Sequence, residues 1–216
     1  IVSWLPERSR EYIESAPQNS NKSYLTLLWE ELHRTGTAAI VGMGGVGKTS
    51  LALAYAHEAF DNRAYDLIYW IFSSTEASLL KSYKDLLLTV GDSPQSKADS
   101  QVIRLVKQKI SSGKKCLLIY DNVPDPGLLK LLNETRSQNT HILITSRCQE
   151  GWKQPFYLNI FQRKDSINYL CINTSIKDQS IAEELADALK DFPLALSYAA
   201  HYINLESRIN QQEIMD

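Results

Sequence analysis

Residues 42–49, which read Gly-Met-Gly-Gly-Val-Gly-Lys-Thr, limit what this chain can fold into more than any other segment. An apolar run at 38–41 precedes them and an Ala- and Leu-rich run at 51–60 follows, which predicts a strand, a tight loop and a helix in succession. Glycines in such a loop let successive N–H groups point at one anion, which the positive end of the helix also favours. A Gly-rich hairpin or linker is the alternative, but the flanking strand and helix favour a site for a nucleoside di- or triphosphate.

In this pattern the Lys48 side chain reaches the β- and γ-phosphates, and the Thr49 hydroxyl binds Mg²⁺. The residues that we assign to the nucleotide from the pattern are Gly42, Gly44, Gly45, Val46, Gly47, Lys48, Thr49 and Ser50.

Composition excludes several other classes of protein. The 216 residues have a net charge of −2, so there is no basic excess to hold nucleic acid. No apolar run approaches 18 residues and no signal peptide is visible, so we expect no membrane segment and a cytoplasmic protein. The three cysteines lack metal-ligand spacing, which fits a reducing compartment. Because the chain begins at Ile1, we also expect it to be part of a longer protein.

Four further apolar runs, at 66–72, 116–120, 141–145 and 156–160, predict strands covered on both faces of a parallel sheet. Helical patterns separate them near 79–87, 102–110 and 128–132, and another helix is predicted from Leu25 to Gly36. Residues 1–22 are polar and are predicted to be irregular. This alternation predicts a doubly wound α/β domain over residues 1–160.

After residue 160 the pattern indicates helices only. Apolar residues recur at helical spacing near 167–171, 181–189 and 194–203. Pro193 suits the first turn of the last of these helices, where its missing N–H leaves no hydrogen bond unmade. We therefore expect a small helical subdomain over residues 161–216.

A second candidate site residue is Asp121, which ends the apolar run Cys116-Leu117-Leu118-Ile119-Tyr120. At the carboxyl end of a parallel strand, its carboxylate lies beside the phosphate-binding loop and can hold Mg²⁺. A turn residue at a strand end is the alternative. The next residue, Asn122, cannot accept a proton and so cannot be a general base.

Arg147 follows the predicted strand at 141–145. Its planar guanidinium could bind a γ-phosphate, and an Arg in a surface loop is an equal alternative from the residues alone.

Four motifs in this order resemble the NB-ARC module of the signal-transduction ATPases with numerous domains (STAND), which include plant resistance proteins and apoptosome scaffolds. These motifs are the loop at 42–49, the segment Leu117-Leu118-Ile119-Tyr120-Asp121-Asn122-Val123, the segment Ile142-Leu143-Ile144-Thr145-Ser146-Arg147 and Pro193-Leu194-Ala195-Leu196. The resemblance covers about residues 24–205, and the last helix looks most like that of microbial members with helical repeats downstream.

The resemblance implies a five-stranded parallel sheet of order 5-1-4-3-2, bound ADP or ATP with Mg²⁺, Arg147 as a γ-phosphate sensor and Pro193 against the adenine. Three departures stand out: the family's second acidic residue is Asn122 here, the Gly two residues before the Pro is Asp191, and no Gly-Arg-Glu-like signature precedes the loop. The resemblance also implies a following winged-helix subdomain, for which no pattern occurs up to Asp216.

These observations favour a nucleotide-controlled switch that is at most a slow ATPase. Its expected partners are other domains of a longer chain and, on activation, further copies of itself. A P-loop ATPase or kinase with real turnover is the second hypothesis, and it lacks a base at position 122. The third is a binding module that uses a degenerate nucleotide site as structural glue, against which the intact Lys48, Thr49 and Asp121 argue.

Overall fold

The computed structural model describes residues 2–8, 11–18, 20–93, 98–111, 113–129 and 139–213. The chain forms two compact units. One consists of Ile1–Ser9, Leu25–Gly42 and Lys48–Tyr157, and the other of Arg10–Tyr24, Met43–Gly47 and Leu158–Asp216. The domain boundary expected at residue 160 stays a prediction.

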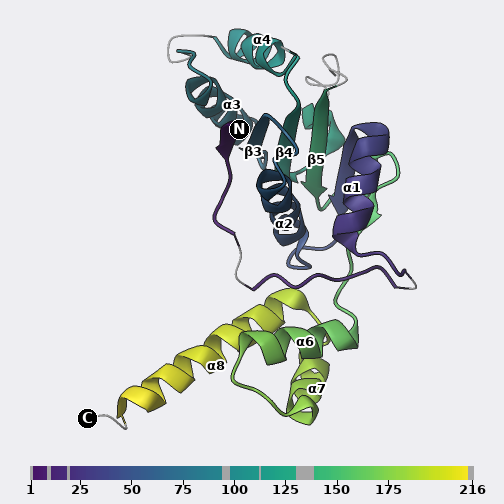
Figure 1. Cartoon of the computed structure of the whole chain (residues 1–216), viewed down its shortest axis with the longest axis vertical. Coiled ribbons are helices and arrows are strands. Elements are labelled where there is room, and N and C mark those ends of the chain that lie inside the picture. Colours follow the sequence, from purple (N-terminus) through teal and green to yellow (C-terminus); the bar gives the residue numbers. More distant parts are fainter. Residues whose placement is uncertain are drawn as a thin grey trace. The chain divides into compact units, whose positions relative to one another are not determined.

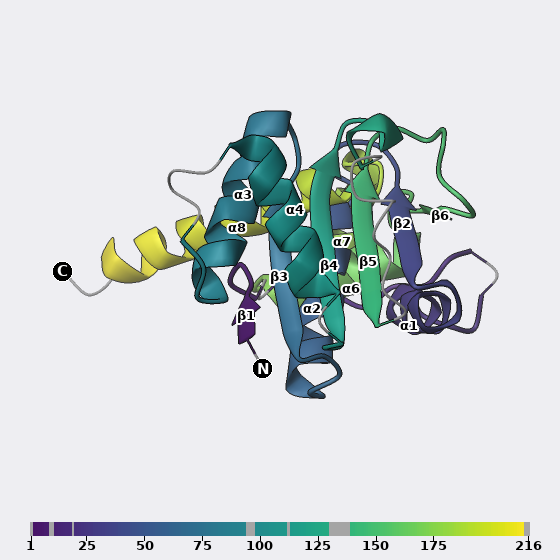
Figure 2. The ribbon, with the colours of Figure 1, turned by 90° about the horizontal axis from the view of Figure 1, so that it is seen from above.

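A parallel sheet of six strands, in the order β1-β3-β4-β5-β2-β6, is the centre of the first unit (Figure 2). The strands are β1 (Val2–Trp4), β2 (Thr37–Val41), β3 (Leu67–Phe72), β4 (Cys116–Val123), β5 (Thr140–Ser146) and β6 (Phe156–Tyr157). The five predicted strands are present in the predicted order, which confirms the α/β fold. The last of them is shorter than expected, because residues 158–160 are not part of β6.

The sixth strand, β1, is new, and the prediction that residues 2–4 are irregular is wrong. β1 pairs with β3 at the sheet edge, with Trp4 opposite Tyr69. The Trp4 ring stacks on Tyr69 at 5.8 Å and meets Phe72 edge-on at 5.6 Å. These ring contacts hold a strand that is too short to show a periodic pattern.

Helices cover both faces of this sheet. They are α1 (Tyr24–Thr35), α2 (Lys48–Asp61), α3 (Glu76–Thr89) and α4 (Asp99–Ile110), with a short 3₁₀ helix at Pro126–Leu129. On one face, α3 and α4 bury side chains such as Tyr83 and Val106 against alternate residues of β3 and β4. On the other, α2 packs on β2, β4 and β5, and α1 joins it through Trp29 and Tyr55, whose rings are 5.8 Å apart. The predicted helix at 128–132 is confirmed only as the 3₁₀ turn, since Leu131 and Leu132 lie outside the described residues.

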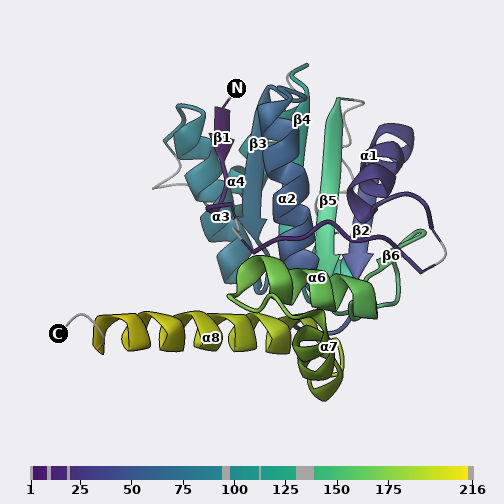
Figure 3. The ribbon, with the colours of Figure 1, turned by 60° about the horizontal axis from the view of Figure 1, so that its bottom comes forward.

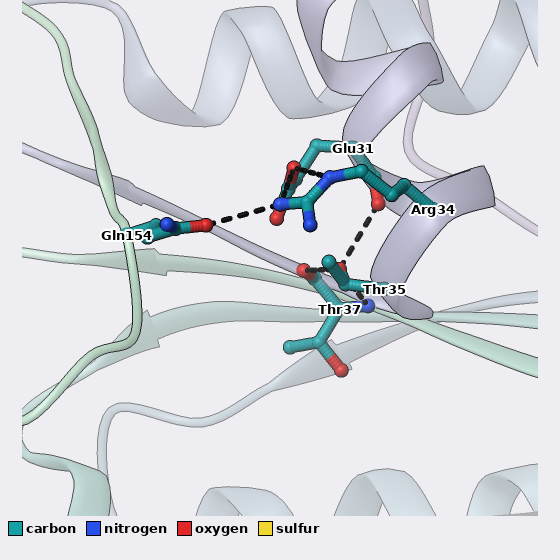
Figure 4. A network of polar contacts seen from close by, with 5 residues as sticks. All are labelled: Glu31, Arg34, Thr35, Thr37 and Gln154. Carbon is teal, nitrogen blue, oxygen red and sulfur yellow. Dashed lines mark hydrogen bonds and ion pairs between the residues drawn. The ribbon is translucent and has the colours of Figure 1, made fainter.

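Polar contacts at the end of α1 fix the entry into β2 (Figure 4). Arg34 donates to Glu31 at 2.6 Å and to Gln154, in the segment before β6, at 3.0 Å. The Thr35 hydroxyl lies 3.0 Å from the Glu31 carbonyl oxygen and 2.7 Å from that of Thr37. Because β2 leads directly into the glycine-rich loop, these contacts hold the strand that carries the loop.

A buried histidine lies at the start of β5, at the opposite end of the strands from the loop. His141 Nδ1 is 2.7 Å from the Tyr65 hydroxyl, and the His33 ring meets the His141 ring edge-on at 5.1 Å. Burial, and then the nearby charges of His33 and Lys115, lower the pKa of His141 to about 4.

We expect this histidine to make the fold less stable in acid. Between pH 6.5 and about 4 the unfolded chain binds a proton at His141 that the folded chain does not, so the free energy of unfolding falls as pH falls. The loss is at most about 3 kcal/mol over this window. In His141→Gln, which keeps an acceptor and cannot be protonated, the free energy of unfolding should depend less on pH. Urea unfolding of both proteins from pH 4 to 7.5 measures this. Parallel pH profiles for the two proteins would contradict this prediction.

The second unit is helical, as predicted, and no strand occurs in its described residues (Figures 1 and 3). Its helices are α6 (Arg163–Asn173), α7 (Gln179–Ala188) and α8 (Pro193–Glu213). Their core contains Leu170, Ala186 and Leu196, together with Ile13 from the N-terminal segment. The Glu11 carboxylate accepts hydrogen bonds from Tyr169 and Ser197, so this segment is held by both polar and apolar contacts. Among the described residues, none of the helices combines the length and apolar character needed to span a bilayer.

Candidate nucleotide-binding site

The glycine-rich loop has the backbone that phosphate binding requires. Gly45 has φ of +80° and Gly47 has φ of +100°, conformations that other residues adopt only with strain. β2 ends one residue before the loop, and α2 begins at Lys48. The strand–loop–helix succession predicted from the sequence is therefore present, with the N-terminus of a 14-residue helix at its end.

Lys48 is buried against the loop. Its side chain is 8% exposed, and Nζ donates to the Gly42 carbonyl oxygen at 2.9 Å. Burial, and then the positive charge of Arg147, lower the pKa of Lys48, whereas Asp121 acts in the opposite direction. A phosphate chain would add negative charge where two cations already repel each other, so the site favours an anion.

Asp121 and Thr49 meet, as the magnesium assignment requires. The Thr49 hydroxyl donates to Asp121 Oδ1 at 2.9 Å, and the Asp121 side chain is buried at the end of β4. A hydroxyl and a carboxylate are hard oxygen ligands of the kind that Mg²⁺ binds together with water and phosphate oxygens. Among the described residues, no cluster of three or more His, Cys, Asp or Glu side chains suited to a metal occurs.

Sequence reasoning missed Thr145, which orients Asp121. Its buried hydroxyl donates to Asp121 Oδ1 at 2.6 Å and accepts from the Asn122 backbone N–H at 2.8 Å. The signal was available, because Thr145 is the last residue of the predicted strand at 141–145, and this strand pairs with the one that carries Asp121. In this part of the sequence, only Arg147 was given a role, as a residue that binds the γ-phosphate.

Asn122 lies in an irregularity of the sheet. The pairing of β4 with β5 shifts between Tyr120 and Val123, and Asn122 has φ of +60°. Asn is among the residues that best tolerate this left-handed conformation. The side chain of Asn122 is exposed, but an amide there cannot take a proton from water.

Arg147 directly follows β5 and is exposed. No hydrogen bond or ion pair joins its guanidinium to another of the residues that the structure describes. Its charge nevertheless acts on Lys48, which places the two cations near each other in the first unit. Arg147 is thus available to an anion, and its role as a γ-phosphate sensor stays a prediction.

Within the second unit, the loop contacts the start of α8. The Leu194 N–H donates to the Gly45 carbonyl oxygen at 3.1 Å. A Cβ at Gly45 would lie only 3.0 Å from Leu194 Cβ and Cδ2 and from Phe192 Cζ. Glycine is therefore required at position 45 for two reasons: the loop has a positive φ there, and the start of α8 approaches too closely for a Cβ.

Pro193 is buried at the first position of α8, as the sequence predicted for a helix start. The same unit contains a cavity of about 410 Å³, lined by Ser15, Ala16, Gln18, Tyr24, residues 158–163 and Asp165. Pro193 does not line this cavity, so its predicted contact with adenine stays a prediction.

The parallel sheet and the Gly-Met-Gly-Gly-Val-Gly-Lys-Thr loop between β2 and α2 define the class of P-loop nucleoside triphosphatases. The sequence model of the NB-ARC domain family matches residues 21–178 of this chain. The chain therefore belongs to the NB-ARC family, which binds ADP or ATP, as the resemblance in its motifs implied.

Curated relatives agree with this assignment. The chain is 24% identical over 202 residues to a putative disease resistance RPP13-like protein of Arabidopsis thaliana, covering 81% of this chain and 18% of the relative. It is 25% identical over 138 residues to a putative disease resistance protein of Solanum bulbocastanum, covering 59% of this chain and 14% of the relative. The chain thus spans less than a third of the length of these relatives.

Solved structures support the fold. A STAND protein with a tetratricopeptide repeat sensor from Pyrococcus horikoshii matches 79% of this chain and 28% of its own, with a TM-score of 0.51 and 18% identity. A Walker-type ATPase of Pyrococcus abyssi matches 97% of this chain and 76% of its own, with a TM-score of 0.54 and 13% identity.

Proposed function

We propose that this module is a nucleotide-controlled switch, which holds ADP or ATP with Mg²⁺ and hydrolyses ATP slowly or not at all. The observation that carries the proposal is the hydrogen bond from the Leu194 N–H to the Gly45 carbonyl oxygen. It ties the phosphate-binding loop directly to the start of α8. A change in the phosphates bound at the loop can therefore act on the start of α8 through this hydrogen bond.

The site residues have separate roles in this proposal. The N–H groups of the loop and Lys48 bind the phosphates, while Thr49 and Asp121 hold Mg²⁺, which neutralises phosphate charge. Thr145 keeps the Asp121 carboxylate oriented. Arg147 binds the γ-phosphate and so distinguishes ATP from ADP, and Pro193 packs against the adenine.

Slow hydrolysis follows from position 122. A general base must accept a proton from the attacking water, and the exposed side chain next to Asp121 is an amide. A nucleotide that is hydrolysed slowly persists long enough to report a state, which suits a switch better than an enzyme with rapid turnover. The alternative of a kinase or an ATPase with real turnover finds no further support among the described residues.

The chain covers only a small part of the length of its relatives, so the processes and partners that the switch controls are also part of the proposal. Its partners would be other domains of a longer chain, with self-assembly on activation, in a cytoplasmic protein. The relatives that are disease resistance proteins and a STAND protein with a repeat sensor support this reading.

Hydrogen exchange would test the switch. With ADP bound, we expect the Leu194 amide to be protected, and with a non-hydrolysable ATP analogue to exchange at least about tenfold faster. Amides in α3, several of whose side chains are buried in the core of the first unit, serve as the internal control. Equal protection of Leu194 in both states would contradict the switch while leaving nucleotide binding intact.

A further inference from the structure

The turn between α7 and α8 has an unusual backbone. Lys190 and Asp191 are consecutive, neither is glycine, and both have positive φ, +54° and +55°. Asp tolerates this region better than most residues but less well than glycine. Position 191 is also where the resemblance leads us to expect glycine, so other contacts must hold Asp191 in this conformation.

A bidentate ion pair between Arg163 and Asp191 provides those contacts. Arg163, the first residue of α6, donates from Nε to Asp191 Oδ1 at 2.8 Å and from a terminal nitrogen to Oδ2 at 2.9 Å. The same guanidinium also donates to Asp187 in α7 at 3.1 Å. The Arg163 side chain is 35% exposed and that of Asp191 15% exposed, so the pair is partly shielded from water. A planar fork on a carboxylate fixes direction as well as distance.

Backbone hydrogen bonds complete the hold on Asp191. Its N–H donates to the Ala186 carbonyl oxygen at 3.0 Å, and its own carbonyl oxygen accepts from the Phe161 N–H at 3.1 Å. The turn is thus fixed to α6, to α7 and to the segment that precedes α6.

This turn sets the position of the residues that touch the phosphate-binding loop. Phe192 and Leu194 are one and three residues after Asp191, and their side-chain atoms lie 3.0 Å from where a Cβ at Gly45 would stand. A rotation of the backbone at Asp191 would withdraw the Leu194 N–H from the Gly45 carbonyl oxygen. All of these contacts lie within the second unit.

We propose that Arg163 is a positioning residue for nucleotide retention: by pairing with Asp191 it holds Phe192 and Leu194 on the phosphate-binding loop and slows release of the nucleotide. This inference rests on the proposed nucleotide binding and adds to it a residue that touches no nucleotide. In this chain the ion pair replaces the conformational freedom that a glycine would give at position 191.

The test is the rate at which a fluorescent ADP (mant-ADP with Mg²⁺) leaves the full chain when chased with excess ADP. Arg163→Gln should accelerate release about tenfold, the effect of losing charge-assisted hydrogen bonds. Arg163→Lys, which keeps the charge without the fork, should give an intermediate rate. Lys164→Gln removes an exposed neighbouring cation that makes no ion pair with described residues, and should leave release unchanged.

A double-mutant cycle separates positioning from general destabilisation. Asp191→Gly removes the carboxylate but accepts positive φ, so Arg163→Gln should have no further effect on release in that background. Urea unfolding of each variant gives the independent measure of stability. Unchanged release in Arg163→Gln, or an equal acceleration in both backgrounds, would overturn the inference alone. Failure of the wild-type chain to bind mant-ADP would overturn the proposed function and the inference together.

Discussion

Replacing Lys48 with Ala is expected to raise the dissociation constant for ADP at least about tenfold. At about 4 Å and an effective dielectric constant near 20, a lysine–phosphate contact has a gross attraction of about 4 kcal/mol. The net loss is smaller, because both charges are hydrated when apart. Lys48 is already desolvated in the protein, which reduces the part of this attraction that hydration offsets.

Isothermal calorimetry with and without Mg²⁺ makes the measurement specific. Lys48→Ala should weaken ADP binding under both conditions, since lysine acts on the phosphates. The matched variant is Asp121→Asn, which keeps an acceptor for the Thr49 and Thr145 hydroxyls and removes only the charge. It should lose the contribution of Mg²⁺ and keep metal-free ADP binding. An unchanged affinity in Lys48→Ala would mean that the loop does not bind phosphate.

Replacing Asn122 with Asp is expected to raise single-turnover ATP hydrolysis by up to about 100-fold, the contribution of a positioned base. The backbone there should accept the change, because Asp as well as Asn tolerates φ near +60°. The backbone N–H that donates to Thr145 is also kept.

The control for this variant is a second substitution at position 122 that also accepts the positive φ. Asn122→Gly accepts the positive φ but supplies no carboxylate, so its hydrolysis should not exceed that of the wild-type chain. Release of labelled phosphate from a stoichiometric enzyme–ATP mixture is the appropriate assay. Rapid hydrolysis by the wild-type chain would show that a base lies elsewhere, and the amide at 122 would then not explain slow turnover.

The parts of the fold that could be predicted are those with long apolar patterns. Buried parallel strands such as β4 and β5 are uninterrupted runs, so the fold followed from local sequence. The positions of Asp121 and Arg147 at the carboxyl ends of these strands followed as well, while their roles stay predictions. The start of α8 was also predicted, from Pro193, whereas α2 begins at Lys48, three residues before the apolar run at 51–60 that predicted it.

What could not be predicted depends on contacts between residues far apart in the chain. β1 is three residues long and is recognisable only by its pairing with β3. Thr145 acquires its role from a neighbouring strand, and Asp191 from Arg163, which is 28 positions away. The departure at Asp191 was visible in the sequence as a missing glycine. The ion pair with Arg163 that compensates for this missing glycine could not be predicted, because the sequence does not show which carboxylate an arginine pairs with.

The path of the backbone between the two units has a practical consequence for anyone who dissects this protein. The chain passes from one unit to the other five times, and the five residues Met43–Gly47 of the phosphate-binding loop belong with the helices and not with the sheet. No single cut can therefore yield either unit intact. A fragment without residues 158–216 would leave Ile13 and Glu11 without the helices that bind them. We therefore expect a shortened version of either unit to require a new connection in place of a simple deletion.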